Sequence, residues 1–314
     1  MSFTIFTERR DDLAFLIMKN ESTGEYAEII PDLGATVHTL HLVSGDTVRS
    51  ILFSDSHDEI GTNPLFRGRI LFPFNDAIPH GEYTFNNTRH NLDLNAPNEN
   101  LTMHGYVYDK QFRNICQECT RDSCSVSLQY TLTSDQMRGY PFNLTLTVTY
   151  ILKNQEFNVR FEIINPGTEA APLSFGWHPY FTFDGSIEGA ILKMDSSHYL
   201  ETDSLHIPTG RLLECNDSPF DFSKGVDITS LVIDNAVTAP SDGTVYLSKD
   251  DRTITLLQDT NFFKYVQIFS PNDGTSIALE PVSAGANCFN RPELGLITLE
   301  PDERIDTFAS VRVD

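Results

Sequence analysis

Three consecutive segments in the middle of the chain alternate between apolar and polar residues with a period of two. They are Val126–Thr133, Leu144–Ile151 and Phe157–Ile163. Aliphatic and aromatic side chains occupy one set of positions, and mostly threonine or charged side chains occupy the other. Such alternation is typical of strands that bury one face and expose the other to water. The segments therefore predict an antiparallel meander.

Strand-like patterns also dominate the rest of the chain. Runs of good helix formers at helical spacing are scarce, and no repeat, low-complexity tract or linker divides the sequence. Leu231–Ile233 is predicted as a short apolar strand that ends before Asp234. We expect residues 1–314 to form one all-β domain, a large antiparallel β-sandwich. Further strands are predicted at Tyr26–Pro31, Ala35–Val43, Val245–Leu247, Thr253–Leu257, Tyr265–Phe269 and Arg304–Val313.

The acidic composition restricts the partners of the protein. Among 314 residues, 44 are Asp or Glu and 22 are Lys or Arg, which gives a formal net charge of −22. Such a chain repels phosphate backbones and anionic lipid, so nucleic acid and membrane surfaces are poor partners. The N-terminal residues lack the apolar core of a secretory signal, and no stretch of eighteen apolar residues is present. We expect a soluble, cytoplasmic protein.

Cysteine usage fits a reducing compartment. The five cysteines are an odd number in a chain of this length. Cys116 and Cys119 have the spacing of half a zinc site, and Cys124 follows closely. No second cysteine or histidine pair with zinc-ligand spacing lies nearby in the sequence. We therefore expect ordinary thiols and no bound metal.

The stretch Phe175–Phe181 contains the only tryptophan of the chain together with His178. Pro179 biases His178 toward extended backbone, so the imidazole is expected at a strand end or in a loop. In aromatic surroundings a histidine is either a packed core residue with satisfied hydrogen bonds or a group with a chemical role. The stretch alone leaves both interpretations open.

A second stretch, Ser276–Pro281, is predicted as a short apolar strand that ends in a carboxylate, Glu280, and a proline. Burying a carboxylate costs free energy unless the group is paired or used in chemistry. An isolated acid at a strand end is equally well explained by exposure to solvent. Together with His178, however, Glu280 can form an acid and base pair whose members differ in charge at neutral pH.

Three further polar residues stand in or beside apolar stretches. Arg69 and Asn75 are hydrogen-bond donors within the apolar segment Leu65–Phe85. His104 precedes Gly105, where the backbone can approach a ligand closely. Each has a structural interpretation as well, and for Arg69 it is a surface guanidinium whose stem packs on a sheet.

In order and spacing these motifs resemble those of the aldose 1-epimerase (galactose mutarotase) family over nearly the whole chain. The resemblance implies a large antiparallel β-sandwich, often called a supersandwich, with an open acidic cleft. Its most specific parts are the His-Pro-Tyr-Phe motif and the late Glu-Pro motif. The matching segments are Gly68-Arg69 with Asn75, Met103-His104-Gly105, Trp177 to Phe181, Ile233-Asp234, and Leu279-Glu280-Pro281 followed by Asn287 and Phe289.

The resemblance also implies roles for individual residues. Glu280 corresponds to the base that takes the proton of the anomeric hydroxyl, and His178 to the acid that protonates the ring oxygen as the pyranose opens. His104 corresponds to a histidine that hydrogen-bonds the sugar, and Asp234 to an acid that holds sugar hydroxyls. This chemistry requires no cofactor. We also expect the surrounding acids to keep His178 in its protonated form.

One position departs from the family pattern. The family has an arginine directly after the asparagine that corresponds to Asn75, whereas this chain has Asp76. Asn75 and Arg69 are the predicted sugar-binding donors. Two alternatives follow for the missing positive charge: either Arg69 or Arg67 replaces it, or the sugar is held differently.

The predicted function is an aldose 1-epimerase for a small-molecule monosaccharide, a free hexose such as galactose or glucose. Two alternatives stay open. The first is a carbohydrate-binding β-sandwich without turnover, because a fold can be kept while its function changes. The second is a mutarotase for a phosphorylated sugar, which needs a cluster of basic residues at the cleft.

Overall fold

The computed structural model describes residues 2–56, 58–271 and 273–314. Every pairing between its named strands is antiparallel. In these residues the helical elements are two short 3₁₀ helices, η1 (Val107–Asp109) and η2 (Pro292–Leu294). No helix in the described ranges is long and apolar enough to cross a membrane. The prediction of an all-β antiparallel fold is confirmed.

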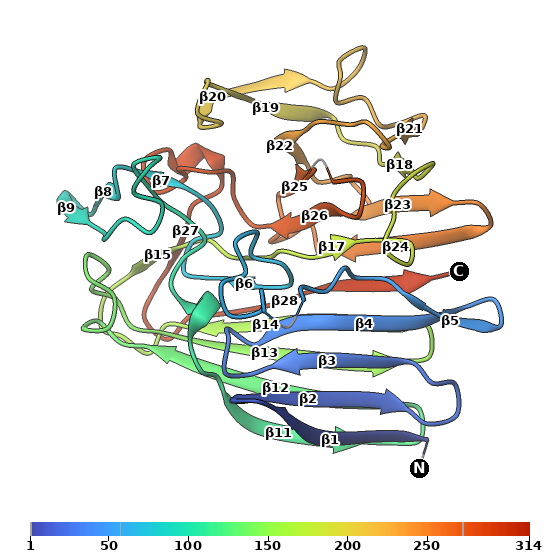
Figure 1. Ribbon diagram of the computed structural model, residues 1–314. Coiled ribbons are helices and arrows are strands. Elements are labelled where there is room, and N and C mark those ends of the chain that lie inside the picture. Colours follow the sequence, from blue (N-terminus) through green and yellow to red (C-terminus); the bar gives the residue numbers. More distant parts are fainter. Residues whose placement is uncertain (1, 57, 272) are drawn as a thin grey trace.

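The three alternating segments form adjacent strands of a nine-stranded sheet (Figure 1). The last strand of the chain pairs with the third of them, so residues far apart in sequence become neighbours in the sheet. The predicted meander is confirmed, with boundaries that differ by a few residues. In spatial order the strands are β11 (Arg113–Cys119), β12 (Ser123–Leu132), β13 (Leu144–Lys153), β14 (Glu156–Ile164), β28 (Arg304–Val313), β24 (Arg252–Gln258), β23 (Thr244–Lys249), β18 (Ile191–Lys193) and β21 (Val226–Asp227).

A five-stranded sheet from the N-terminal part of the chain covers one face of this sheet. Figure 1 shows its blue strands lying across the green strands of the larger sheet. Apolar side chains from both sheets, including Met18, Leu40, Leu128 and Val148, belong to one buried cluster. This packing of two sheets is the predicted sandwich. The five strands, in order, are β1 (Phe3–Arg10), β2 (Leu13–Asn20), β3 (Tyr26–Ile30), β4 (Thr36–Ser44) and β5 (Thr47–Ser50).

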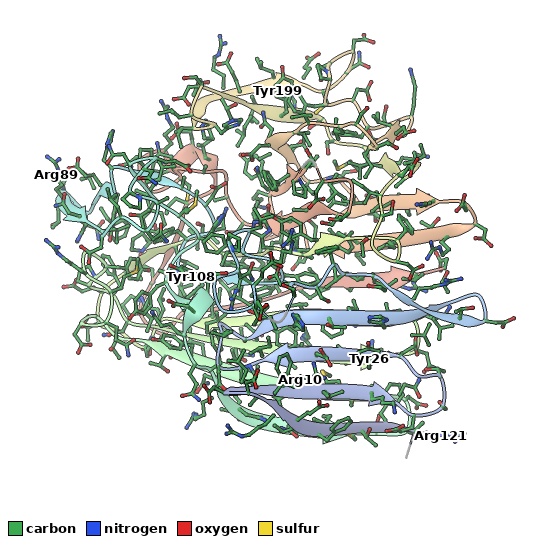
Figure 2. The ribbon with its side chains drawn as sticks, viewed as in Figure 1. Arg10, Tyr26, Arg89, Tyr108, Arg121 and Tyr199 are labelled. Carbon is green, nitrogen blue, oxygen red and sulfur yellow. The ribbon has the colours of Figure 1, made fainter. Side chains whose placement is uncertain are left out.

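The other face of the five-stranded sheet carries a smaller apolar cluster. Phe15 and Ile17 alternate with the residues of β2 that face the main core, and they pack with Ile30 and Ile60. The Arg10 guanidinium lies 4.5 Å from the centre of the Phe15 ring and pairs with Glu28 at 2.6 Å. Figure 2 labels Arg10 on this face. A cation over an aromatic ring thus shields the cluster from water.

An eight-stranded sheet forms the remaining large layer and includes the strand with Glu280. Its strands contain the predicted segment Tyr265–Phe269 and the two short strands on either side of His178. The strand β17 (Tyr180–Phe181) also belongs to this sheet: it pairs with β26 (Ile277–Val282) but lies outside the linear order of the other strands. In spatial order the other strands are β20 (Pro208–Glu214), β19 (His198–Thr202), β22 (Asp234–Thr238), β25 (Tyr265–Phe269), β26 (Ile277–Val282), β16 (Gly176–Trp177) and β6 (Ile70–Leu71).

Three two-stranded pairs complete the strands of the described residues. One of them joins the segment after Asn75 to the segment before His104, which brings these two predicted site residues close together. The pairs are β7 (Ile78–Pro79) with β10 (Leu101–Thr102), β8 (Glu82–Phe85) with β9 (Thr88–Asn91), and β15 (Ala171–Leu173) with β27 (Ile297–Leu299).

One strand prediction is wrong. Leu231–Ile233 is not a strand: Val232 is 77% exposed, and Asp234 begins β22 instead of following a strand. The predicted strand Ser276–Pro281 is confirmed as β26, with bounds shifted by one residue to Ile277–Val282. Pro281 lacks an amide hydrogen, but every residue of β26 is buried, so packing maintains the strand.

Replacing Phe161 tests the aromatic packing beneath the site. Phe161 on β14 is 1% exposed and contacts the rings of Phe175 and Phe263 at centroid distances of 5.5 and 5.7 Å. Phe161→Ala should lower the free energy of unfolding by about 3–5 kcal/mol, because it removes buried area and leaves a cavity. Urea denaturation measures the change. Phe308→Ala on the adjacent strand is the control, and since Phe308 is 36% exposed its loss should be clearly smaller. Equal losses would contradict this description of the core.

Candidate active site

His178 lies in the short link between β16 and β17, as its proline neighbour predicts. Its backbone N–H donates to the Arg69 carbonyl at 3.0 Å, and its carbonyl accepts from the Gly68 N–H at 2.8 Å. Its ring stacks on Tyr180, with 5.1 Å between the ring centres and 9° between the planes. The residue is only 4% exposed. Backbone hydrogen bonds and stacking together fix the imidazole in one orientation.

Glu280 projects from β26 toward His178. Its Oε1 lies 3.5 Å from His178 Nε2, and the residue is 3% exposed. Among the described residues this imidazole is the only recorded partner of the carboxyl group. The structure therefore brings together the two groups that sequence analysis selected as an acid and base pair, although about a hundred residues separate them in the chain.

His104 adjoins this pair on a tight turn. It has a φ of +63°, and the following Gly105 has a φ of +78°. The His104 ring is 5.3 Å from the His178 ring, measured between centres. Its Nδ1 lies 2.9 Å from the Asn75 carbonyl, which can only accept, so Nδ1 carries the proton. In the neutral ring Nε2 is then an acceptor for a ligand hydroxyl.

Asp234 and Gln267 continue the same polar surface on neighbouring strands. Gln267 on β25 is paired with Glu280 across the ladder, and its Nε2 donates to Asp234 Oδ1 at 2.7 Å. The exposed His206 approaches the other oxygen of Asp234 at 3.9 Å. Asp76 accepts a hydrogen bond from the Ala77 N–H at 2.6 Å. Three carboxyl groups, those of Asp76, Asp234 and Glu280, thus surround one space.

One cleft of about 260 Å³ is lined by the two histidines His104 and His178, by Gln267, and by the carboxyl groups of Asp76, Asp234 and Glu280. This volume is just below the ~300–1,000 Å³ of pockets that hold drug-sized ligands, and it suits a smaller molecule. Aromatic and other apolar side chains form the rest of the wall. They include Leu65, Phe66, Met103, Tyr180 and Phe269.

Burial controls the protonation of the pair. It raises the pKa of Glu280 well above its ordinary value, and the Asp76 and Asp234 carboxyls raise it further. Burial lowers the pKa of His178 well below its ordinary value, and the neighbouring His104 adds to this effect. Both shifts favour the uncharged form of each group, a carboxylic acid beside a neutral imidazole. The expectation that nearby acids keep His178 protonated is wrong, because burial, with contributions from His104 and Arg67, lowers the pKa of His178.

Arg69 and Asn75 support the cleft without lining it. The Arg69 guanidinium donates to the carbonyls of Ile60 and Tyr108, at 3.0 and 2.9 Å, and burial lowers its pKa to about 10. Asn75 Nδ2 donates to the Ala284 carbonyl at 2.8 Å. In this structure the donors of both residues are directed at the protein framework.

Arg67 does not supply the missing positive charge either. Its Nη1 pairs with Asp55 Oδ1 at 2.6 Å, and its guanidinium lies 4.9 Å from the centre of the Phe53 ring. Neither Arg67 nor Arg69 therefore replaces the arginine absent at Asp76, which leaves the other alternative, that the sugar is held differently. The residues that line the cleft include no lysine or arginine.

The family model described as aldose 1-epimerase matches residues 19–311 of this chain. The chain belongs to the aldose 1-epimerase family. The resemblance found in the motifs is thereby confirmed over nearly the whole sequence.

Curated relatives of this aldose 1-epimerase family member are distant in sequence. It is 26% identical to the YihR protein of Escherichia coli, over 71% of each chain. It is 26% identical to an aldose 1-epimerase of Haemophilus influenzae, over 61% of this chain and 56% of that protein. The human galactose mutarotase is 25% identical, over 56% and 50%. The matched segments thus span about half the length of the two relatives that are named as enzymes.

Solved structures show the same fold. A galactose mutarotase-like protein from Clostridium acetobutylicum superposes with a TM-score of 0.89 and 19% identity, covering 100% of this chain and 99% of that one. Galactose 1-epimerase from Lactobacillus acidophilus superposes with a TM-score of 0.82 and 17% identity, over 99% and 98%. The fold is therefore the galactose mutarotase-like β-sandwich, as predicted.

Sequence analysis missed two polar residues of the cleft. Gln267 is polar at the centre of the apolar strand Tyr265–Phe269, and this position is a signal that could have found it. Glu99 lies at the cleft on an exposed loop within a run of polar residues, where nothing in the sequence distinguishes it.

Gly105→Ala should disturb the turn that positions His104. A Cβ at Gly105 would lie 2.1 Å from the Phe72 carbonyl oxygen, whereas one at Gly189, with a similar φ of +73°, would meet nothing within 4 Å. Gly189→Ala incurs only the conformational cost of about 1 kcal/mol, so Gly105→Ala should lose more unfolding free energy than this control. Urea denaturation compares the two variants. Equal losses would show that the turn adapts without cost.

Proposed function

We propose that this protein is a cofactor-independent aldose 1-epimerase that interconverts the α and β anomers of free aldohexoses such as galactose or glucose. The observation that carries the proposal is the 3.5 Å approach of His178 Nε2 and Glu280 Oε1 in a cleft of about 260 Å³. Family membership supports the same reaction class.

Anomer exchange requires one proton to leave and one to arrive. A base takes the proton of the anomeric hydroxyl, the bond between C1 and the ring oxygen breaks, and an acid protonates that oxygen. Rotation about C1–C2 and the reverse transfers close the ring on the other face of the carbonyl. The protons balance within the pair of Glu280 and His178, so the reaction needs no further reactant.

The pair can perform these transfers when it holds exactly one proton. Two arrangements meet this condition: a carboxylate with an imidazolium, and a carboxylic acid with a neutral imidazole. Burial favours the second arrangement before substrate binds. We assign Glu280 the role of the base, which requires its carboxylate form. The sugar hydroxyls stabilise this form, because they donate hydrogen bonds in place of the water that the buried carboxylate has lost. His104 Nε2 accepts a hydroxyl hydrogen beside them.

The cleft disfavours a phosphorylated substrate. Its lining contains four acidic side chains and no lysine or arginine, so a phosphate would meet repulsion without a compensating cation. The binding-module alternative differs from the enzyme in a single observable, which is turnover. The cytoplasmic location and the single-domain organisation stay predictions.

Removing either member of the pair tests the proposed reaction. His178→Asn and Glu280→Gln should each lower the enzymatic rate of anomer exchange by about 10²-fold or more, because general acid or base catalysis is lost. Polarimetry of freshly dissolved α-glucose and α-galactose measures the rate above buffer. His198→Asn and Glu188→Gln, which lie outside the lining of the cleft, are the matched controls. If the native protein binds sugar without accelerating the exchange, it is a binding module.

Replacing Asp76 should change how kcat/KM depends on pH. In the native enzyme kcat/KM for a neutral sugar falls as pH rises through the pKa at which the pair loses its shared proton. Because the Asp76 carboxyl raises the pKa of Glu280, Asp76→Asn should move this alkaline limb to lower pH. Polarimetric rates from about pH 5 to 9 locate the limb. Asp122→Asn, on an exposed hairpin, should leave it in place. A limb that moves upward with Asp76→Asn would refute this electrostatic account.

A further inference from the structure

The cleft concentrates acidic side chains. Among the described residues its lining includes the carboxyl groups of Asp76, Glu99, Asp234 and Glu280, and it includes no lysine or arginine. A smaller hollow of about 100 Å³ opens beside it and shares Asp76, Glu99 and Asp234. The two histidines beside Glu280 do not offset this charge, because burial lowers the pKa of both. The field inside the cleft therefore attracts cations.

Within residues 2–56, 58–271 and 273–314, no lysine or arginine pairs with the carboxyl groups of Asp76 and Asp234. Asp234 receives a hydrogen bond from the neutral amide of Gln267, and its nearest basic group is the exposed His206 at 3.9 Å. Asp76 accepts only from the backbone N–H of Ala77 among the described residues. Burial raises the pKa of Asp76 to about 6 and also raises the pKa of Asp234, so both groups are costly to hold as carboxylates, and a ligand that supplies positive charge lowers this cost.

Glu280 gives a second, independent indication that a donor comes from a ligand. The residue is 3% exposed, it lines the cleft, and no described group donates a hydrogen bond to its carboxyl. The nearest polar atom, His178 Nε2, is 3.5 Å away. A buried carboxyl without a donor is costly, and a ligand that carries several N–H or O–H donors satisfies it.

We propose that the preferred substrate is an amino sugar, an aldose with a protonated amino group near its anomeric carbon. Its ammonium group donates to Asp76 and Asp234, which places the anomeric hydroxyl at Glu280. A metal ion fits less well, because in the described ranges no three histidine, cysteine or acidic side chains are arranged to hold one. This inference rests on the proposed function and narrows its substrate class.

A comparison of three sugars tests the proposal. NMR follows anomer exchange of freshly dissolved α-2-amino-2-deoxyglucose, α-glucose and the N-acetylated amino sugar at about pH 6.5, where most of the free amine is protonated. The amino sugar should show a kcat/KM at least about tenfold above both others, because charge-assisted hydrogen bonds are stronger than neutral ones. Since the attraction is electrostatic, this advantage should shrink as salt is raised.

Two variants that each remove one negative charge test whether the preference for the amino sugar arises in the cleft. Asp76→Asn should reduce the ratio of kcat/KM for the amino sugar to that for glucose by about tenfold. Asp122→Asn changes the net charge equally but lies on an exposed hairpin outside the lining, so it should keep the native ratio. Circular dichroism of both variants establishes that they are folded.

The outcomes separate this inference from the proposed function. Exchange of glucose at a rate equal to or above that of the amino sugar would overturn the inference and leave the epimerase proposal intact. Failure to accelerate any of the three sugars would overturn both. A preference that disappears with EDTA and returns with Ca²⁺ would assign the carboxyl groups to a metal and also overturn the inference.

Discussion

Exclusion of water from the contact between His178 and Glu280 is the constraint on which the site depends. In water the two groups would ionise independently, with the carboxyl group charged at neutral pH. At 4% and 3% exposure, burial disfavours the charged form of each. Both groups therefore favour their uncharged forms until a ligand enters the cleft. A more open sheet edge would expose the same residues and lose this coupling.

The fold maintains this contact by connecting distant segments through their backbones. The Gly68 N–H and the Arg69 carbonyl hold the two sides of His178, while the Arg69 guanidinium donates to the carbonyls of three other segments, at Leu33, Ile60 and Tyr108. Asn75 links His104 to Ala284 by one carbonyl and one amide. Residues such as Arg69 and Asn75 thus act as framework, and they position the groups that face the ligand.

Sequence patterns predicted the parts of the structure that local physics determines. Alternation located β12, β13 and β14, and Pro179 placed His178 outside a helix. Sequence patterns did not predict the features that depend on burial by distant segments of the chain. The framework role of Arg69 and the lowered pKa of His178 both depend on groups that approach from other segments. Residue types identified the candidates, but only packing determined how each is solvated and bonded.

The charge of the cleft also bears on how the shared proton moves. Asp76 and Asp234 raise the pKa of Glu280 by repulsion, which favours the protonated carboxyl before binding. A cation seated between these two acids would cancel much of that repulsion, and the pKa of Glu280 would fall. The proton would then shift toward the imidazole of His178, giving the carboxylate and imidazolium that ring opening uses. In this scheme the positive charge of the substrate moves the proton from Glu280 to His178 and so prepares both groups for ring opening. A neutral sugar can stabilise the Glu280 carboxylate only through hydrogen bonds from its hydroxyl groups.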